Sequence, residues 1–278
     1  MTLVKDKALG ILPQFNEQGK LVKEAILSCQ LPEVFKNVKQ GEPIFFDDGK
    51  IEGIICGVGA NQFQVKIINA KESGSKLKAE KGINLPTIDL GISGLTLKDK
   101  VDLSFVAHHA DIINFSFVNS AEDVEELYTE LKALGVLQKL SVVLKIETRI
   151  AFENLLPILL SAMKVNTIGV MIARGDLAIE TGWQHIGAVQ DEILSTCSAA
   201  HVPVIWATQV LENLAKSGLP SRSEMTDVSS SLKAECVMLN KGPYVNEAIR
   251  LLDKILISSE NHRQKKERML PQMKKVER

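Results

Sequence analysis

Short apolar runs recur along the second half of the chain, and polar residues follow each of them. The clearest runs cover residues 142–144, 168–173 and 202–207, and helical sequence separates one run from the next. Runs of this length without alternation are typical of strands that are buried on both faces of a parallel sheet. The polar residues that follow them then lie at the carboxyl ends of the strands, where such sheets bind ligands.

The pattern predicts an α/β domain in which one helix is followed by five strand–helix units. We expect strands at 111–118, 141–147, 167–173, 202–207 and 234–239. We expect helices at 96–108, from 120 onward, at about 149–163 and 183–200, at 209–215, at about 224–233 and at 244–259. Since every connection is a crossover, the strands should be parallel and the units right-handed.

The first 86 residues have a different pattern, with short strand-like segments at 44–46, 51–56 and 63–68, of which Val65 to Ile67 alternates, and a turn at Asp47-Asp48-Gly49. Such segments predict a small antiparallel barrel or sandwich. Gly, Asn and Pro within residues 81–86 mark a boundary. The predicted domains are therefore a β-rich domain at 1–86, a partial (β/α) barrel at 87–259 and a basic polar tail at 260–278.

Length and composition narrow the class of protein. Five units fill about 170 residues at the spacing of (β/α)₈ barrels, and eight would need about 280. The 278 residues therefore hold either an open five-stranded sheet or part of a longer protein. The net charge of −1 gives no indication of a nucleic-acid or membrane partner. Scattered cysteines and the absence of an apolar leader segment favour a cytoplasmic protein.

Lys145 and Glu147 are the first candidates for chemistry, because residues two apart on a strand point to the same face. They form either an internal ion pair or a functional pair of a charge-stabilising lysine and a metal-binding carboxylate. Asp176 follows the next strand and would join Glu147 at the same edge. Two carboxylates without nearby Cys or His favour Mg²⁺ or Mn²⁺ over zinc.

The segment after residue 173 is a candidate anion site. Gly175 allows close backbone approach, and the N–H groups of residues 174–176 lie between a strand end and the next predicted helix. Thr208 has the equivalent place one strand later, where its hydroxyl either caps the following helix or faces the substrate. None of the five histidines has metal-ligand spacing, and we assign none of them to catalysis.

Several of these segments resemble the pyruvate kinase family. Met171 to Leu177 (MIARGDL) is similar to the family's metal-binding strand, and Leu144 to Thr148 (LKIET) to its catalytic strand. Pro203 to Leu211 (PVIWATQVL) resembles the strand that carries the substrate threonine. The resemblance is collinear from about residue 25 to 257. It also covers residues 46–49, 81–86, 115–118, 220–228 and 236–239.

The resemblance implies a role for each matching position of the barrel. Lys145 would stabilise the phosphoryl group in transfer, and Glu147 and Asp176 would hold the divalent cation. Thr208 would lie near the enolate carbon and assist its protonation. The backbone at Gly175, with Ala173 and Arg174 nearby, would contact the substrate carboxylate, so that 173–176 and Thr208 form the substrate site.

Further expectations concern ligands and the β-rich domain. The implied substrates are phosphoenolpyruvate or pyruvate and ADP or ATP, and the implied metals are Mg²⁺ (or Mn²⁺) and K⁺. The resemblance makes residues 1–86 a mobile lid, in which Asp48 and Lys81 would approach the nucleotide and its metal. A homo-oligomer and a missing N-terminal half are both open.

The chain also departs from the family pattern. It contains no Asn-Phe-Ser-His-like segment and no Lys-Gly-Pro-Glu-Ile-Arg-like segment. In the family these segments supply the phosphate-binding arginine and the K⁺ ligands, and the first three barrel strands are absent with them. Two alternatives to a pyruvate kinase-like phosphotransferase therefore stay open. One is a non-catalytic metal- or anion-binding module, and the other is a metal-dependent enolate lyase on a related barrel.

Overall fold

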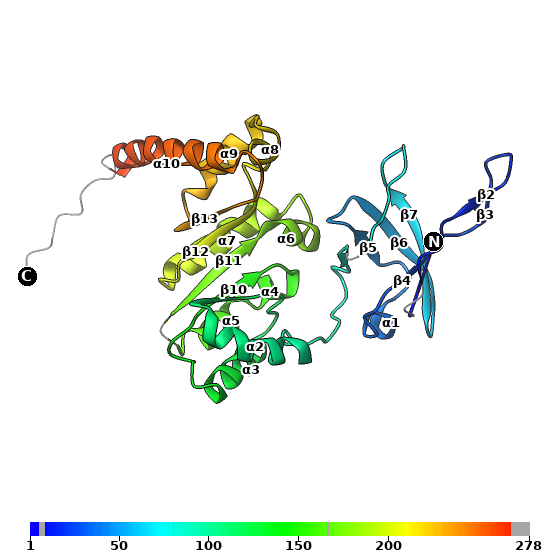
Figure 1. The fold of residues 1–278 in the computed structure, drawn as a ribbon, viewed down its shortest axis with the longest axis horizontal. Helices are drawn as coiled ribbons and strands as arrows, with labels where there is room; N and C mark the ends of the chain where they lie inside the picture. Colours follow the sequence, from blue (N-terminus) through cyan, green and yellow to red (C-terminus); the bar gives the residue numbers. More distant parts are fainter. Residues whose placement is uncertain (6–8, 80, 166, 268–278) are drawn as a thin grey trace, which may run out of the picture.

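A computed structural model describes residues 1–5, 9–79, 81–165 and 167–267 of the chain. Two separate sheets dominate it, one built from the N-terminal third and the other from residues beyond 111. Figure 1 shows the N-terminal sheet beside the end of the second sheet at which α6 lies. Within the described residues no helix is both long and apolar enough to cross a membrane.

The N-terminal sheet has six strands in the order β4-β1-β7-β6-β5-β8. These are β1 (Thr2–Val4), β4 (Ile26–Ser28), β5 (Pro43–Phe46), β6 (Ile51–Gly59), β7 (Gln62–Asn69) and β8 (Ile83–Asn84). A hairpin of β2 (Gln14–Phe15) and β3 (Leu21–Lys23) and a short helix α1 (Val34–Asn37) complete this part. The strands expected from the sequence are β5, β6 and β7. The others are only two or three residues long, too short for a period to be visible.

Close packing in this sheet explains one glycine. Gly53 lies on the buried face of β6, and a Cβ atom there would lie 2.4 Å from Val65 Cγ1 on β7. Ile44, Phe46 and Phe63 fill the same core and are almost completely buried. The residues of this core form a cluster separate from that of the second sheet.

The second sheet has five parallel strands in the order β13-β12-β11-β10-β9. They are β9 (Ile112–Phe115), β10 (Ser141–Ile146), β11 (Ile168–Ala173), β12 (Val204–Val210) and β13 (Cys236–Leu239). This arrangement confirms the predicted partial barrel of five parallel strands with an all-β N-terminal part. The predicted domain boundary at residue 86 stays a prediction.

Helices connect these strands, and several expected bounds change. The helices are α2 (Leu97–His109), α3 (Ala121–Ala133), α4 (Arg149–Glu153), α5 (Leu155–Ala162), α6 (Arg174–Thr181), α7 (Ile186–Ala199), α8 (Glu212–Ser217), α9 (Arg222–Ser231) and α10 (Val245–Glu267). The helix expected at 149–163 breaks at Asn154, and α6 was not predicted. Strand β12 continues to Val210, so the helix expected from 209 starts at Glu212. Of the predicted basic tail, residues 268–278 lie outside the described residues.

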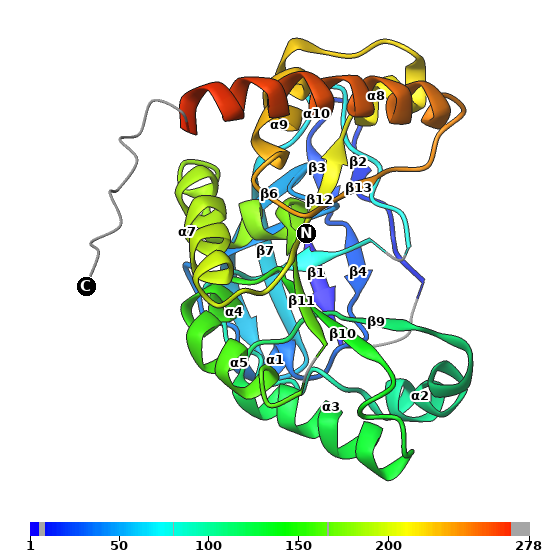
Figure 2. The ribbon, with the colours of Figure 1, turned by 90° about the vertical axis from the view of Figure 1, so that its left-hand side faces the viewer.

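The two faces of the parallel sheet carry different residues. Leu144 and Ile146 of β10 belong to the large core that includes side chains of α3, α5 and α7. Figure 2 shows α3, α5 and α7 along one side of this sheet. Val143 and Lys145 alternate with them and point to the other face, where Val143 joins the small cluster of Met171 and Ala207. We call this second face the inner face.

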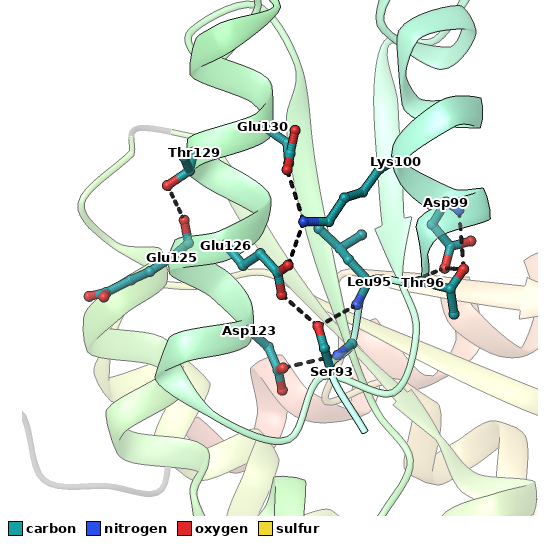
Figure 3. Close-up of polar contacts among 11 residues, drawn as sticks. Ser93, Leu95, Thr96, Asp99, Lys100, Asp123, Glu125, Glu126, Thr129 and Glu130 are labelled. Carbon is teal, nitrogen blue, oxygen red and sulfur yellow. Dashed lines mark hydrogen bonds and ion pairs between the residues drawn. The ribbon is translucent and has the colours of Figure 1, made fainter. Parts of the chain in front are cut away.

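The segment that leads from the N-terminal sheet into α2 is held by polar contacts with α3 (Figure 3). Ser93 Oγ donates to Glu126 Oε2 at 2.5 Å, and the Gly94 N–H donates to Asp123 Oδ1 at 3.0 Å. Lys100 of α2 lies 2.7 Å from Glu126 and 3.0 Å from Glu130. These contacts fix the start of α2 relative to α3, and the expected N-caps Thr96 and Ser120 both form capping boxes.

Leu144→Ala should lower the free energy of unfolding by about 2–5 kcal/mol, because it leaves a cavity in the core between the sheet and its helices. Leu156→Ala removes the same atoms from α5 at a side chain that is 63% exposed. It should change the free energy of unfolding by about 0.5 kcal/mol or less. Urea unfolding followed by circular dichroism measures both variants, and equal losses would contradict the burial of β10 described above.

Candidate active site

Lys145 and Glu147 meet at the carboxyl end of β10, on the inner face. Lys145 Nζ lies 3.0 Å from Glu147 Oε1 and donates to Ser116 Oγ at 2.9 Å. The Glu147 side chain is 2% exposed, and its Oε2 accepts a hydrogen bond of 3.2 Å from the Phe117 N–H. The two side chains thus share a face, as their spacing predicts, and they form the ion pair that was one of the two sequence interpretations.

Asp176 lies in the first turn of α6, directly after β11. Burial raises the pKa of Asp176 and the negative charge of Asp48 raises it further, while a hydrogen bond from the Asn84 side chain opposes the shift. Burial also raises the pKa of Glu147 although Lys145 lowers it, and the charge of Asp176 adds to the increase. Glu147 and Asp176 therefore lie within electrostatic reach of each other, in surroundings where a cation would be favoured.

These two carboxylates fit a magnesium ion better than a zinc ion. Among the described residues, no group of three or more His, Cys, Asp or Glu side chains could enclose a metal. Mg²⁺ usually takes one or two protein carboxylates and completes its octahedron with water and phosphate oxygens. Glu147 and Asp176 match that requirement in number and in ligand type.

Thr208 does not cap α8, the helix that follows it in the chain, and its hydroxyl is not free. Its Oγ1 accepts a hydrogen bond of 3.0 Å from the Gly175 N–H, in the first turn of α6. The N-cap of α6 is Ala173, whose side chain cannot accept a hydrogen bond, so the hydroxyl from the neighbouring strand takes that function. An anion at Gly175 would have to replace this contact, and the predicted anion site there stays a prediction.

Arg174 holds the end of β12 rather than presenting its guanidinium freely. It forms a two-point ion pair with Asp227 of α9, one contact of which, from Nη2 to Oδ2, measures 2.9 Å. Its Nε donates to the Ala207 carbonyl at 2.9 Å and its Nη2 donates to the Thr208 carbonyl. The guanidinium also lies 4.5 Å from the ring centroid of Trp206. Arg174 therefore fixes the backbone around Thr208.

The predicted residues of the β-rich domain lie close to α6. Asp48 is near enough to Asp176 for its charge to raise the pKa of that carboxyl. A Cβ atom on the neighbouring Gly49 would lie 3.5 Å from Ile179 of α6. Lys81 instead pairs with Asp47 at 2.9 Å, which raises the pKa of Lys81. The turn 47–49 is thus placed at the site, while the predicted contact of Lys81 with a nucleotide stays untested.

Backbone strain is concentrated at this site. Most of the non-glycine residues with positive φ among the described residues adjoin it, namely Asp47, Asp48, Phe117, Thr208, Gln209 and Leu211. Left-handed φ is unfavourable for threonine because of its branched Cβ, and each such residue costs about 1–3 kcal/mol. Strain of this size persists only where surrounding contacts enforce it, as Arg174 does at Thr208.

Four contact residues were not singled out from the sequence. Ser116 and Phe117 follow β9 and contact Lys145 and Glu147, and their place at a strand end was the signal that could have identified them. Asn84 and Glu180 hydrogen-bond each other although 96 positions separate them, and no local pattern indicates such a pair.

A cavity of about 600 Å³ opens beside the site, between the segment 83–96, helix α2 and strand β9. Ser116, Phe117 and Glu180 line it together with apolar side chains such as Leu103 and Ile113. The site therefore adjoins open space along the β9 edge of the sheet.

Comparison with known proteins decides the family. The family model "Pyruvate kinase, barrel domain" matches residues 4–249 of the chain. The chain belongs to the pyruvate kinase family. This finding confirms the resemblance seen in the three strand-end segments.

Pyruvate kinases from fungi and bacteria give the extent of the similarity. The chain is 33% identical to the pyruvate kinase of Hypocrea jecorina over 235 residues, which are 82% of this chain and 42% of that protein. For Debaryomyces hansenii the identity is 31%, over 93% of this chain and 52% of the relative. For Thermotoga maritima it is 32%, over 86% and 51%. The chain thus spans about half the length of these pyruvate kinases.

Asp227→Asn should lower the free energy of unfolding by about 2 kcal/mol, because it leaves the guanidinium of Arg174, a side chain that is 12% exposed, without its charged partner. Asp191→Asn is the matched control, since Asp191 pairs with Lys233 and both side chains are more than half exposed. It should cost about 0.5 kcal/mol or less. Chemical unfolding of the two variants checks this, and an equally small loss for Asp227→Asn would exclude the structural role given to Arg174.

Proposed function

We propose that this chain carries the metal- and lysine-bearing part of a pyruvate kinase active site. The reaction would be Mg²⁺-dependent phosphoryl transfer between phosphoenolpyruvate and ADP, giving pyruvate and ATP. The observation that supports it most directly is the ion pair of Lys145 with the buried Glu147 on the inner face, with Asp176 in electrostatic reach. Family membership favours this reaction over the enolate lyase.

In this proposal Lys145 contributes a positive charge that lies at the carboxyl edge of the sheet. The Lys145 side chain is 24% exposed, so its ammonium group can leave Ser116 and approach a phosphoryl oxygen. Glu147 and Asp176 would hold the divalent cation, which supplies charge neutralisation for phosphoryl and enolate oxygens when it is bound. Catalysis would consist mainly of positioning and electrostatic stabilisation.

The substrate carboxylate would bind at the N-terminus of α6. This helix begins at Arg174, and the backbone of 173–175 there carries the positive end of the helix dipole. Thr208, which already contacts the Gly175 N–H, would lie beside the bound substrate and assist protonation of the enolate carbon. Asp48 and Lys81 would approach ADP from the β-rich domain.

A non-catalytic binding module is the second candidate. The strands at the ends of the five-stranded sheet, β9 and β13, each have one neighbour in this sheet. Unpaired strand edges of this kind are suited to pairing with further chain. The K⁺ ion that the resemblance implies and the homo-oligomer left open by the sequence stay predictions. The cytoplasmic location expected from composition stays a prediction as well.

The metal assignment predicts that Glu147→Gln and Asp176→Asn each weaken Mn²⁺ binding about 10-fold or more, because each removes one anionic ligand. Titration of Mn²⁺ against the purified chain, followed by electron paramagnetic resonance, measures the affinity.

Glu125→Gln is the matched control for this titration, since Glu125 is an exposed carboxylate paired with Lys164. Its affinity should stay within about 2-fold of the wild type. Unchanged affinity in both Glu147→Gln and Asp176→Asn would disprove the metal site.

The 278-residue chain by itself should show little pyruvate kinase turnover, because no segment of it matches the family's phosphate-binding arginine or K⁺ ligands. A lactate dehydrogenase-coupled assay with phosphoenolpyruvate, ADP, Mg²⁺ and K⁺ measures this. Turnover at the level of a full-length pyruvate kinase would contradict the prediction. Mn²⁺ binding without turnover would favour the binding-module function.

A further inference from the structure

Asn84 connects the β-rich domain to α6 at two carboxylates. It is the last residue of β8, and its Nδ2 donates to Glu180 Oε1 at 3.3 Å. The same side chain hydrogen-bonds Asp176 and thereby opposes the rise in the pKa of that carboxyl. Asp176 and Glu180 are four residues apart on α6, so their side chains lie on one face of the helix.

A second set of contacts fixes the same junction. Glu180 accepts a hydrogen bond from the backbone N–H of Arg149, the first residue of α4. Arg149 Nε in turn donates to the Pro86 carbonyl at 3.2 Å. Asn84 and Pro86, which flank the exit of the β-rich domain, are therefore both tied to the helices at the carboxyl edge of the sheet.

An uncharged amide suits this place for a chemical reason. Burial raises the pKa of both Asp176 and Glu180, and the negative charge of Asp176 raises the pKa of Glu180 further. An asparagine side chain offers two N–H donors and no charge, so it can serve both carboxylates at once. Asp176 is the one whose charge also raises the pKa of Glu147, so a donor that holds Asp176 acts on the candidate metal-binding pair.

We propose that Asn84 is a positioning residue that couples the place of the β-rich domain to the metal-binding geometry of Asp176. The inference rests on the proposed function, in which Asp176 and Glu147 hold the divalent cation. With β8 in its observed place, Asn84 donates a hydrogen bond to Asp176, whose charge acts on Glu147. If β8 moves away, Asp176 loses this donor and the metal site loosens.

Asn84→Ala tests the coupling. It should weaken Mn²⁺ binding about 10-fold or more, the usual effect of removing a group that orients a metal ligand. Asn37→Ala is the matched control, because the Asn37 side chain also ties this domain to the following segment, by a hydrogen bond of 3.1 Å to the Asp89 carbonyl. It touches neither carboxylate and should change the affinity less than about 2-fold.

A double-mutant cycle separates positioning from a general loss of structure. In the Asp176→Asn background, Asn84→Ala should weaken Mn²⁺ binding by less than about 2-fold more, since residues that act through one another are not additive. Additive losses, or an equal loss in Asn37→Ala, would overturn the coupling.

Amide hydrogen exchange distinguishes failure of this inference from failure of the proposed function. In the metal-free chain, Asn84→Ala should raise exchange in α6 and β8, and Asn37→Ala should not raise it in α6. A wild-type chain that binds no Mn²⁺ would defeat the metal site and the coupling together. Normal Mn²⁺ binding by the wild type with unchanged exchange and affinity in Asn84→Ala would overturn the coupling alone.

Discussion

The burial of the Glu147 carboxylate is the constraint on which the rest of the site depends. Moving such a group out of water costs several kcal/mol unless charge and hydrogen bonds replace the solvent. Lys145 supplies the charge, and the Phe117 N–H supplies a hydrogen bond. Phe117 adopts a φ of 53° at this point, and β9 ends two residues earlier, at Phe115. The end of one strand is thus shaped by a carboxylate on the next.

The same constraint extends to the neighbouring strands. Asp176 adds a second buried carboxylate, so the site carries more negative charge than Lys145 alone neutralises. Such an excess of negative charge favours the binding of a cation. Thr208 satisfies the first turn of α6, and Arg174 holds the strained backbone at Thr208 by its contacts to two carbonyls and to Asp227. The strained backbone at Thr208 is therefore held by α6, the helix that also carries Asp176.

Apolar runs, residue spacing and capping residues were enough to predict the features that depend on a few neighbouring positions of the sequence. The five parallel strands, the shared face of Lys145 and Glu147 and the caps at Thr96 and Ser120 all follow from spacing within a few residues. Helix α6 was missed because it starts directly after β11 without an N-cap side chain of its own, and a hydroxyl from another strand takes that place. The contacts of Asn84 were missed because they join segments almost a hundred residues apart.

The contacts that orient the candidate catalytic groups all come from within this chain. Lys145 and Glu147 are held by residues after β9, and Thr208 by the start of α6. Because the donors and acceptors of these contacts all belong to the five-stranded sheet and its helices, the contacts set the geometry without help from the β-rich domain. Asp176 differs, since one of its hydrogen bonds comes from Asn84 on β8. Motion of that domain would therefore act on one carboxylate of the pair and leave the lysine pair in place.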